Sequence, residues 1–80
     1  MASSIFATDK LKEYRESKGY TQMEMCGLLS IEFDKDVALS TYQKWEQGTF
    51  ALTPDNALML SRFTRIDLKD LVVRNDKNTI

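Results

Sequence analysis

The 80-residue sequence contains no histidine and only one cysteine, Cys26. A single cysteine cannot form an internal disulfide, which is typical of proteins in a reducing cytoplasm. Zinc sites are built mainly from cysteine and histidine, so this composition argues against a metal site. The chain also has no glycine-rich phosphate loop and no cysteine in an electropositive setting. Nothing in it therefore predicts an enzyme, a cofactor or a small-molecule substrate.

Proline, glycine and long apolar runs are also scarce, with one proline and three glycines in the chain. No run approaches the ~18 apolar residues of a membrane-spanning helix, and the first ten residues lack the basic start and apolar core of a signal peptide. No alternating run of β-branched residues predicts a strand. We therefore expect one small, cytoplasmic, all-α domain that does not bind membranes and has no deep catalytic cleft.

A strong excess of basic residues is missing as well, because 11 Lys and Arg residues stand against 12 Asp and Glu residues, for a net charge of −1. This balance argues against a nonspecific nucleic-acid coat, which needs a strongly basic surface. A protein that reads specific DNA can still be acidic overall if its few cations lie on one face. We expect the acidic segment 32–36 (EFDKD) to lie away from phosphate.

Helix signals fill most of the chain. Thr8 or Asp9 can cap a first helix that runs to about Lys18. Thr21 with Glu24 three residues later is a capping box, the clearest helix start in the sequence. These signals predict two helices that begin within the first third of the chain.

The end of the second helix has two possible positions. The helix either continues through Phe33 or stops near Ser30, with a loop after it. Ser40 with Gln43 makes another capping box, which predicts a third helix that ends at Gly48.

Two further helices complete the expected fold. Thr53 caps the fourth helix with Pro54 at its first position, and a short fifth helix starts at Asp67. The apolar residues that we expect the second and fourth helices to bury are Met25, Cys26, Leu28, Leu29, Ala57, Leu58, Leu60 and Phe63, and the fifth helix is apolar at Leu68, Leu71 and Val72. The expected organisation is a flexible N-terminal arm at 1–8, a folded domain at 9–73 and a frayed tail at 74–80.

The stretches LKEYRESKGYTQMEM (11–25) and STYQKWEQG (40–48) describe two joined helices, the second short and polar on one side. With the proline-led helix that follows, they resemble the helix-turn-helix family of phage Cro proteins and phage repressors over residues 9–73. The resemblance implies a compact five-helix domain like that of the lambda repressor. It also implies a sequence-specific DNA-binding transcriptional regulator, a repressor of phage or bacterial origin at the bacterial nucleoid. The helix at 40–47, the recognition helix, would read the major groove.

The sequence departs from this family pattern between the two helices. Ser30 stands where the turn usually has a glycine, and Cys26 stands where alanine is usual. Gly27 lies inside the second helix, where it costs about 1 kcal/mol relative to alanine. The connection also exceeds the usual turn by about six residues. We therefore expect a lengthened helix-turn-helix that keeps its recognition helix.

Helical geometry divides the recognition helix into two sides. Tyr42, Trp45 and Glu46 face the domain, where the two aromatic side chains fill the core. The resemblance implies that Glu46 forms a structural ion pair with Arg15 in the first helix. It also implies that Gln22, at the first turn of the second helix, touches a DNA phosphate and can brace a side chain of the recognition helix. The alternative for Gln22 is an ordinary exposed polar residue.

The other side of the recognition helix carries groups that suit DNA: Ser40, Thr41, Gln43, Lys44 and Gln47. Hydroxyl groups can bond bases or phosphates, an amide can pair with adenine, and an ammonium can donate to guanine. The resemblance aligns Leu39, Ser40 and Lys44 with base-facing positions, where Leu39 would contact a thymine methyl, and Gln47 with a phosphate contact. The alternative is a solvated polar side without a ligand.

The predicted partner is a double-stranded DNA operator. The segment 68–73 has more apolar residues than a small domain hides easily, and in the resembled family such ends help to pair subunits. We therefore expect a weak or DNA-assisted homodimer on a palindromic site, with simple closure of the monomer core as the alternative. A different class of function also fits the acidic composition: a protein-interaction module, such as an antirepressor or an antitoxin-like partner.

Overall fold

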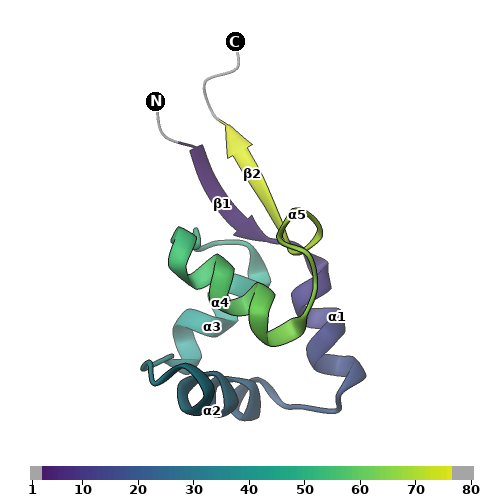
Figure 1. Cartoon of the computed structure of the whole chain (residues 1–80), viewed down its shortest axis with the longest axis vertical. Helices are drawn as coiled ribbons and strands as arrows, with labels where there is room; N and C mark the ends of the chain where they lie inside the picture. The colour runs from purple at the N-terminus through teal and green to yellow at the C-terminus, as the bar shows by residue number, and fades with distance from the viewer. Residues whose placement is uncertain (1–2, 77–80) are drawn as a thin grey trace.

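The computed structural model describes residues 3–76, which form five helices and a two-stranded sheet (Figure 1). In chain order the elements are β1 (Ser3–Ala7), α1 (Asp9–Ser17), α2 (Gln22–Phe33), α3 (Leu39–Gln47), α4 (Pro54–Thr64), α5 (Leu68–Leu71) and β2 (Val72–Asp76). The five predicted helices are confirmed, and they make up the compact body. The sheet, which the sequence did not predict, extends from one end of this body.

Most helix starts follow their local capping signals. The Thr21 hydroxyl accepts from the backbone N–H of Glu24, and the Glu24 carboxylate accepts from the backbone N–H of Thr21, so the capping box is complete. Thr8 caps α1 and Thr53 caps α4 with Pro54 at its first position. Each of these side chains satisfies an N–H that the first turn leaves without an intrahelical partner.

The second predicted capping box, Ser40 with Gln43, is wrong. Helix α3 begins one residue earlier, its N-cap is Ala38, and no side chain caps it. The entry to α3 is instead set by Val37, which is buried and whose N–H donates to the Ser30 hydroxyl at 3.3 Å. Burial of an apolar residue just before the helix thus fixes its start, and Ser40 lies inside the first turn.

The two predicted end segments also need correction. Residues 3–7, expected in a flexible arm, and residues 74–76, expected in a frayed tail, belong to the antiparallel strands β1 and β2, with Ser3 opposite Asp76 and Ala7 opposite Val72. Residues 1–2 and 77–80 of the predicted arm and tail lie outside the described residues.

Two further hydrogen bonds attach the sheet to the helical body. The backbone N–H of Thr8 donates to the carbonyl of Leu71 at 2.8 Å, and that of Leu52 donates to the carbonyl of Ile5 at 2.6 Å. The sheet therefore continues directly from α5 and is also joined to the connection between α3 and α4.

The core lies between the helices and is closed by α5 and β1. Its buried residues are Leu11, Met25, Cys26, Leu29, Val37, Tyr42, Trp45, Leu52, Ala57, Met59, Leu60 and Leu71. Helix α2 continues through Phe33, which decides between the two predicted ends, and Phe33 packs edge-on against Phe63. Leu58, expected in the core, is instead exposed because Met59 and Leu60 occupy the inner side of α4. Among residues 3–76, no helix has the length and apolar character needed to cross a membrane.

Candidate nucleic-acid interface

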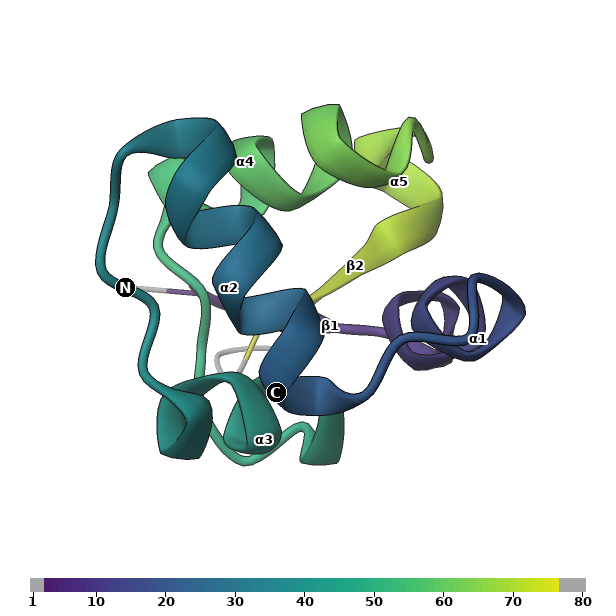
Figure 2. The ribbon, with the colours of Figure 1, turned by 90° about the horizontal axis from the view of Figure 1, so that it is seen from below.

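Helix α3 lies at the edge of the body, with the first turns of α2 beside it (Figure 2). Its inner side carries Tyr42 and Trp45, which are 0% and 3% exposed and pack edge-to-face with ring centroids 6.1 Å apart. The predicted DNA-facing residues lie elsewhere on the helix. Ser40, Lys44 and Gln47 are exposed, whereas Leu39, Thr41 and Gln43 are half-buried. The helix therefore has one packed side and one accessible polar side.

Arg15 and Glu46 form the expected ion pair between α1 and α3. The Arg15 Nε donates to Glu46 Oε2 at 2.7 Å and Nη2 donates to Oε1 at 3.1 Å, a two-pronged geometry. The third arm of the guanidinium, Nη1, donates to the carbonyl of Tyr20 at 2.9 Å. Since the two side chains are only 12% and 4% exposed, this pair fixes the position of α3 on the body.

Gln22 joins this ion pair to the outer side of α3. Its Nε2 donates to Glu46 Oε1 at 3.0 Å, and its Oε1 accepts from Gln43 Nε2 at 3.2 Å. Both ends of the Gln22 amide are therefore engaged within the protein, and Gln43 is held in one orientation. The sequence suggested that Gln22 could brace the recognition helix. It could not show that the same amide also contacts the buried carboxylate.

The electrostatics of this region follow from the ion pair and from burial. Burial opposes ionisation of Glu46, but hydrogen bonds, with that from Arg15 the largest, outweigh it and lower the Glu46 pKa below 4.5. Burial raises the pKa of the Tyr42 phenol and of the Cys26 thiol. The buried Tyr42 hydroxyl interacts with the Glu46 carboxylate, although among the described residues it has no partner in full hydrogen-bond geometry. Cys26 is therefore a packing residue, as its sequence setting indicated.

The C-terminal end of α3 is built around Lys44. Gly48 adopts a left-handed conformation with φ of 77°, which reverses the chain and ends the helix. The Lys44 carbonyl then accepts from the backbone N–H groups of Thr49 and Phe50, at 3.0 and 3.4 Å. The returning loop places the Phe50 ring under the Lys44 ammonium, with Nζ 4.5 Å from the ring centroid. The sequence did not predict this contact, because the two residues are six positions apart across a helix end.

The lengthened connection between α2 and α3 is fixed to the body. Asp34 ends α2 in a left-handed conformation with φ of 50°. The Lys35 backbone N–H donates to the Ser30 carbonyl at 3.2 Å, and its ammonium bonds the Asn56 side chain in α4. The acidic residues of this connection, Asp34 and Asp36, are exposed, as is Glu32 in the last turn of α2. The extra residues therefore form an ordered wall beside α4, with their acidic groups in solvent.

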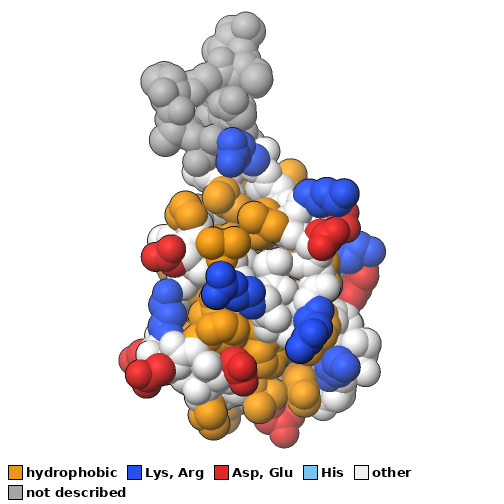
Figure 3. All heavy atoms as spheres, viewed as in Figure 1, with side chains coloured by type: hydrophobic (Ala, Val, Ile, Leu, Met, Phe, Trp, Pro, Cys, Tyr) orange, Lys and Arg blue, Asp and Glu red, His pale blue; other side chains and the backbone are white. Residues whose placement is uncertain are grey.

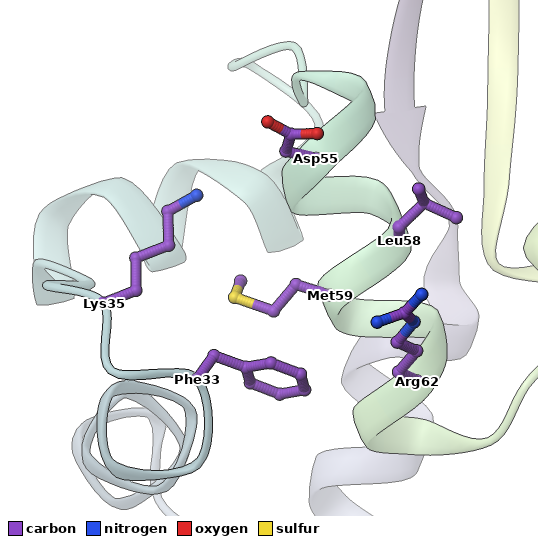
Figure 4. Close-up of a pocket in the computed structure, with 6 residues that line it drawn as sticks. All are labelled: Phe33, Lys35, Asp55, Leu58, Met59 and Arg62. Atoms are coloured by element: carbon purple, nitrogen blue, oxygen red, sulfur yellow. The ribbon is translucent and has the colours of Figure 1, made fainter.

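A hollow of about 320 Å³ lies between this wall and α4 (Figure 4). Its lining comprises Phe33, Lys35, Asp55, Leu58, Met59 and Arg62, none of which belongs to α3. On the face that Figure 3 shows, Lys and Arg side chains are scattered among acidic and apolar ones rather than gathered in one patch. Among residues 3–76, no cluster of His, Cys, Asp and Glu could hold a metal ion. The accessible polar side of α3 is therefore the strongest candidate for an interface.

Comparison with known proteins gives one match. The Helix-turn-helix family model, of the Cro/C1 type, matches residues 11–71, which includes all five helices except the first two residues of α1. No curated protein and no solved structure matches the chain. The family match supports a DNA-binding regulator in general.

Proposed function

The chain belongs to the Cro/C1-type helix-turn-helix family, and from this premise we propose that it is a sequence-specific, Cro-like transcriptional repressor. Helix α3 enters the major groove of a DNA operator in the bacterial cytoplasm. The observation that carries this proposal is the two-sided character of α3, with buried aromatic residues inside and accessible polar groups outside. A helix of this kind fits the major groove and reads base edges with its outer residues.

The outer residues divide into base contacts and phosphate contacts. Ser40 and Lys44, both exposed, read base edges, and the half-buried Leu39 reaches a thymine methyl from the start of the helix. The half-buried Thr41 offers its hydroxyl group to a base or a phosphate. Gln47, exposed in the last turn, contacts a phosphate.

Gln43 and Gln22 act together in this proposal. The Gln43 amide, held by Gln22 at 3.2 Å, presents its oxygen and its second N–H to an adenine edge. Gln22 lies at the first position of α2, where backbone N–H groups favour a phosphate. This pairing is supported by the hydrogen bond between the two amides, which fixes the reading group before DNA arrives.

We propose a weak or DNA-assisted homodimer as the binding form. Leu68 and Val73 are 38% and 52% exposed, and Ile5, Leu68 and Val72 line a shallow, mostly apolar hollow beside the sheet. A two-fold dimer through this surface would match a palindrome with half-sites about one helical turn apart. Sedimentation with and without operator DNA tests it. Leu68→Asp should reduce the dimer on DNA, and an unchanged dimer would contradict this assignment of the interface.

The decisive experiment measures DNA binding directly. The full chain is titrated onto duplexes selected from a random pool and onto the DNA upstream of its own gene. Lys44→Ala should weaken binding to the selected site by about tenfold or more, whereas Lys12→Ala, an exposed lysine of α1, should have little effect. The salt dependence should be shallow because few cations are available.

Failure to bind DNA would contradict the proposal. If no duplex binds below micromolar concentration at modest salt, the sequence-specific assignment is wrong, and the domain uses its surface on another protein.

A further inference from the structure

We propose that Phe50 is a positioning residue for Lys44, so that the loop after α3 determines where the recognition helix presents its ammonium group. This inference rests on the proposed function, because it assigns a second residue to the same DNA-reading surface. It concerns a residue outside α3 that the alignment of helix positions does not identify.

The contact is a cation–π interaction between the end of the Lys44 side chain and the Phe50 ring. The ammonium nitrogen lies 4.5 Å from the ring centroid, well within the ~6 Å reach of such pairs. Among the described residues, no carboxylate forms an ion pair with Lys44. Its charge is therefore held in place without being neutralised and stays available for DNA.

The loop that carries the ring is itself fixed to the helix. The Lys44 carbonyl accepts from the backbone N–H of Thr49 at 3.0 Å, from the Thr49 hydroxyl at 3.3 Å and from the N–H of Phe50 at 3.4 Å. Gly48, with φ of 77°, allows the reversal that these bonds require. The backbone of Lys44 thus holds the segment that positions its own side chain.

Phe50 is partly exposed, so it is not a core residue. Its side chain is 42% accessible, although the nearby Leu52 is 4% exposed and fills the core. The exposed part of the ring gains nothing from hydrophobic burial. We assign the exposed ring the role of holding the Lys44 side chain. A lysine loses considerable rotamer freedom when it binds DNA, and a side chain that the ring already restricts loses less.

The interaction has a modest expected size. At exposed sites a cation–π pair changes an equilibrium by about two- to fivefold. Phe50→Leu should therefore weaken operator binding two- to fivefold. Phe50→Trp, which offers a better π-face, should bind as well as the wild type or more tightly.

The test is a double-mutant cycle on the full chain, with the selected duplex as the DNA probe. Phe50→Leu is compared in the wild-type background and in the Lys44→Ala background, and thermal unfolding verifies that each variant is folded. If Phe50 acts through Lys44, its substitution has no further effect once Lys44 is removed. An equal loss in both backgrounds, or no loss in the wild type, would overturn the proposal.

A second measurement needs no DNA and separates this inference from the proposed function. In NMR spectra of the free protein, the ring current of Phe50 should shift the Lys44 side-chain methylene protons next to the ammonium upfield. Phe50→Leu should abolish that shift, while the corresponding protons of Lys12 stay unchanged. If the shift is present but no duplex binds, the proposed function fails and the contact stands. If the shift is absent, the positioning role is wrong even when DNA binds.

Discussion

The inner and outer sides of α3 are held in place by different means, although Lys44 on the outer side directly precedes Trp45 on the inner side. On the inner side, Trp45 and Glu46 are fixed by burial and by a two-pronged ion pair. On the outer side, Gln43 and Lys44 are fixed by single contacts, one amide hydrogen bond and one aromatic ring. The comparison indicates that substitutions on the inner side change stability, whereas those on the outer side change binding and leave the fold intact.

The largest effect is expected from breaking the ion pair. Glu46→Ala leaves Arg15, whose side chain is 12% exposed, without its partner, and should lower the free energy of unfolding by about 3–5 kcal/mol. Glu13→Ala, which breaks only the exposed pair with Lys10, should cost about 1 kcal/mol or less. Urea unfolding followed by Trp45 fluorescence measures both. Equal losses would show that the two pairs do not differ in this way.

The dependence of stability on pH tests the same ion pair. The Glu46 pKa is lowered in the folded state, from an ordinary value of 4.5, so the folded protein binds fewer protons than the unfolded chain. The contribution of the Glu46 carboxylate to the free energy of unfolding is complete above about pH 4.5. It is lost as the pH falls through the folded-state pKa of this group. In Glu46→Gln this part of the acid dependence should disappear. Unfolding midpoints measured between neutral pH and pH 3 test this expectation, and parallel curves for the two proteins would contradict it.

Removal of the Tyr42 hydroxyl should have a smaller effect of opposite sign. The group is buried beside the Glu46 carboxylate without full hydrogen-bond geometry in the described structure, so its desolvation cost is only partly offset. Tyr42→Phe keeps the ring against Trp45 and should raise the free energy of unfolding by about 1 kcal/mol. The same urea titration measures it. A destabilised variant would mean that the hydroxyl is bonded in solution.

The smallest effect on stability is expected on the outer side. Ser40 is exposed and does not cap the helix, so Ser40→Ala should change the free energy of unfolding by no more than about 0.5 kcal/mol. Its operator affinity should nevertheless fall if Ser40 makes the proposed base-edge contact. Unfolding and DNA titration on the same sample give both values. A loss of stability with unchanged affinity would reverse the roles assigned to the two sides.

Local signals were reliable where a short stretch makes its own hydrogen bonds. Thr21 and Glu24 form their capping box in the structure because both partners lie within one turn. The same pattern at Ser40 and Gln43 was misleading, since buried Val37 sets the helix start. The Gln43 side chain donates to Gln22 in another helix. A capping pattern therefore predicts a helix nearby but not the residue at which it begins.

Long-range pairings were beyond the local patterns. The strands β1 and β2 come from opposite ends of the chain, and neither segment shows the alternation typical of a strand. Leu58 was expected inside from its helical spacing, but Met59 and Leu60 take the inner side of α4. The contact between Lys44 and Phe50 depends on a chain reversal at Gly48, which helix periodicity does not describe.

The sequence by itself determined the five helices, the inward aromatic residues and the polar side of α3, because capping and helical periodicity act over a few residues. The tertiary structure decided the sheet that joins the chain's ends, the path of the lengthened connection, and the contacts that hold Gln43 and Lys44. Those features depend on which distant groups meet when the core closes, and no pattern within one helix carries that information.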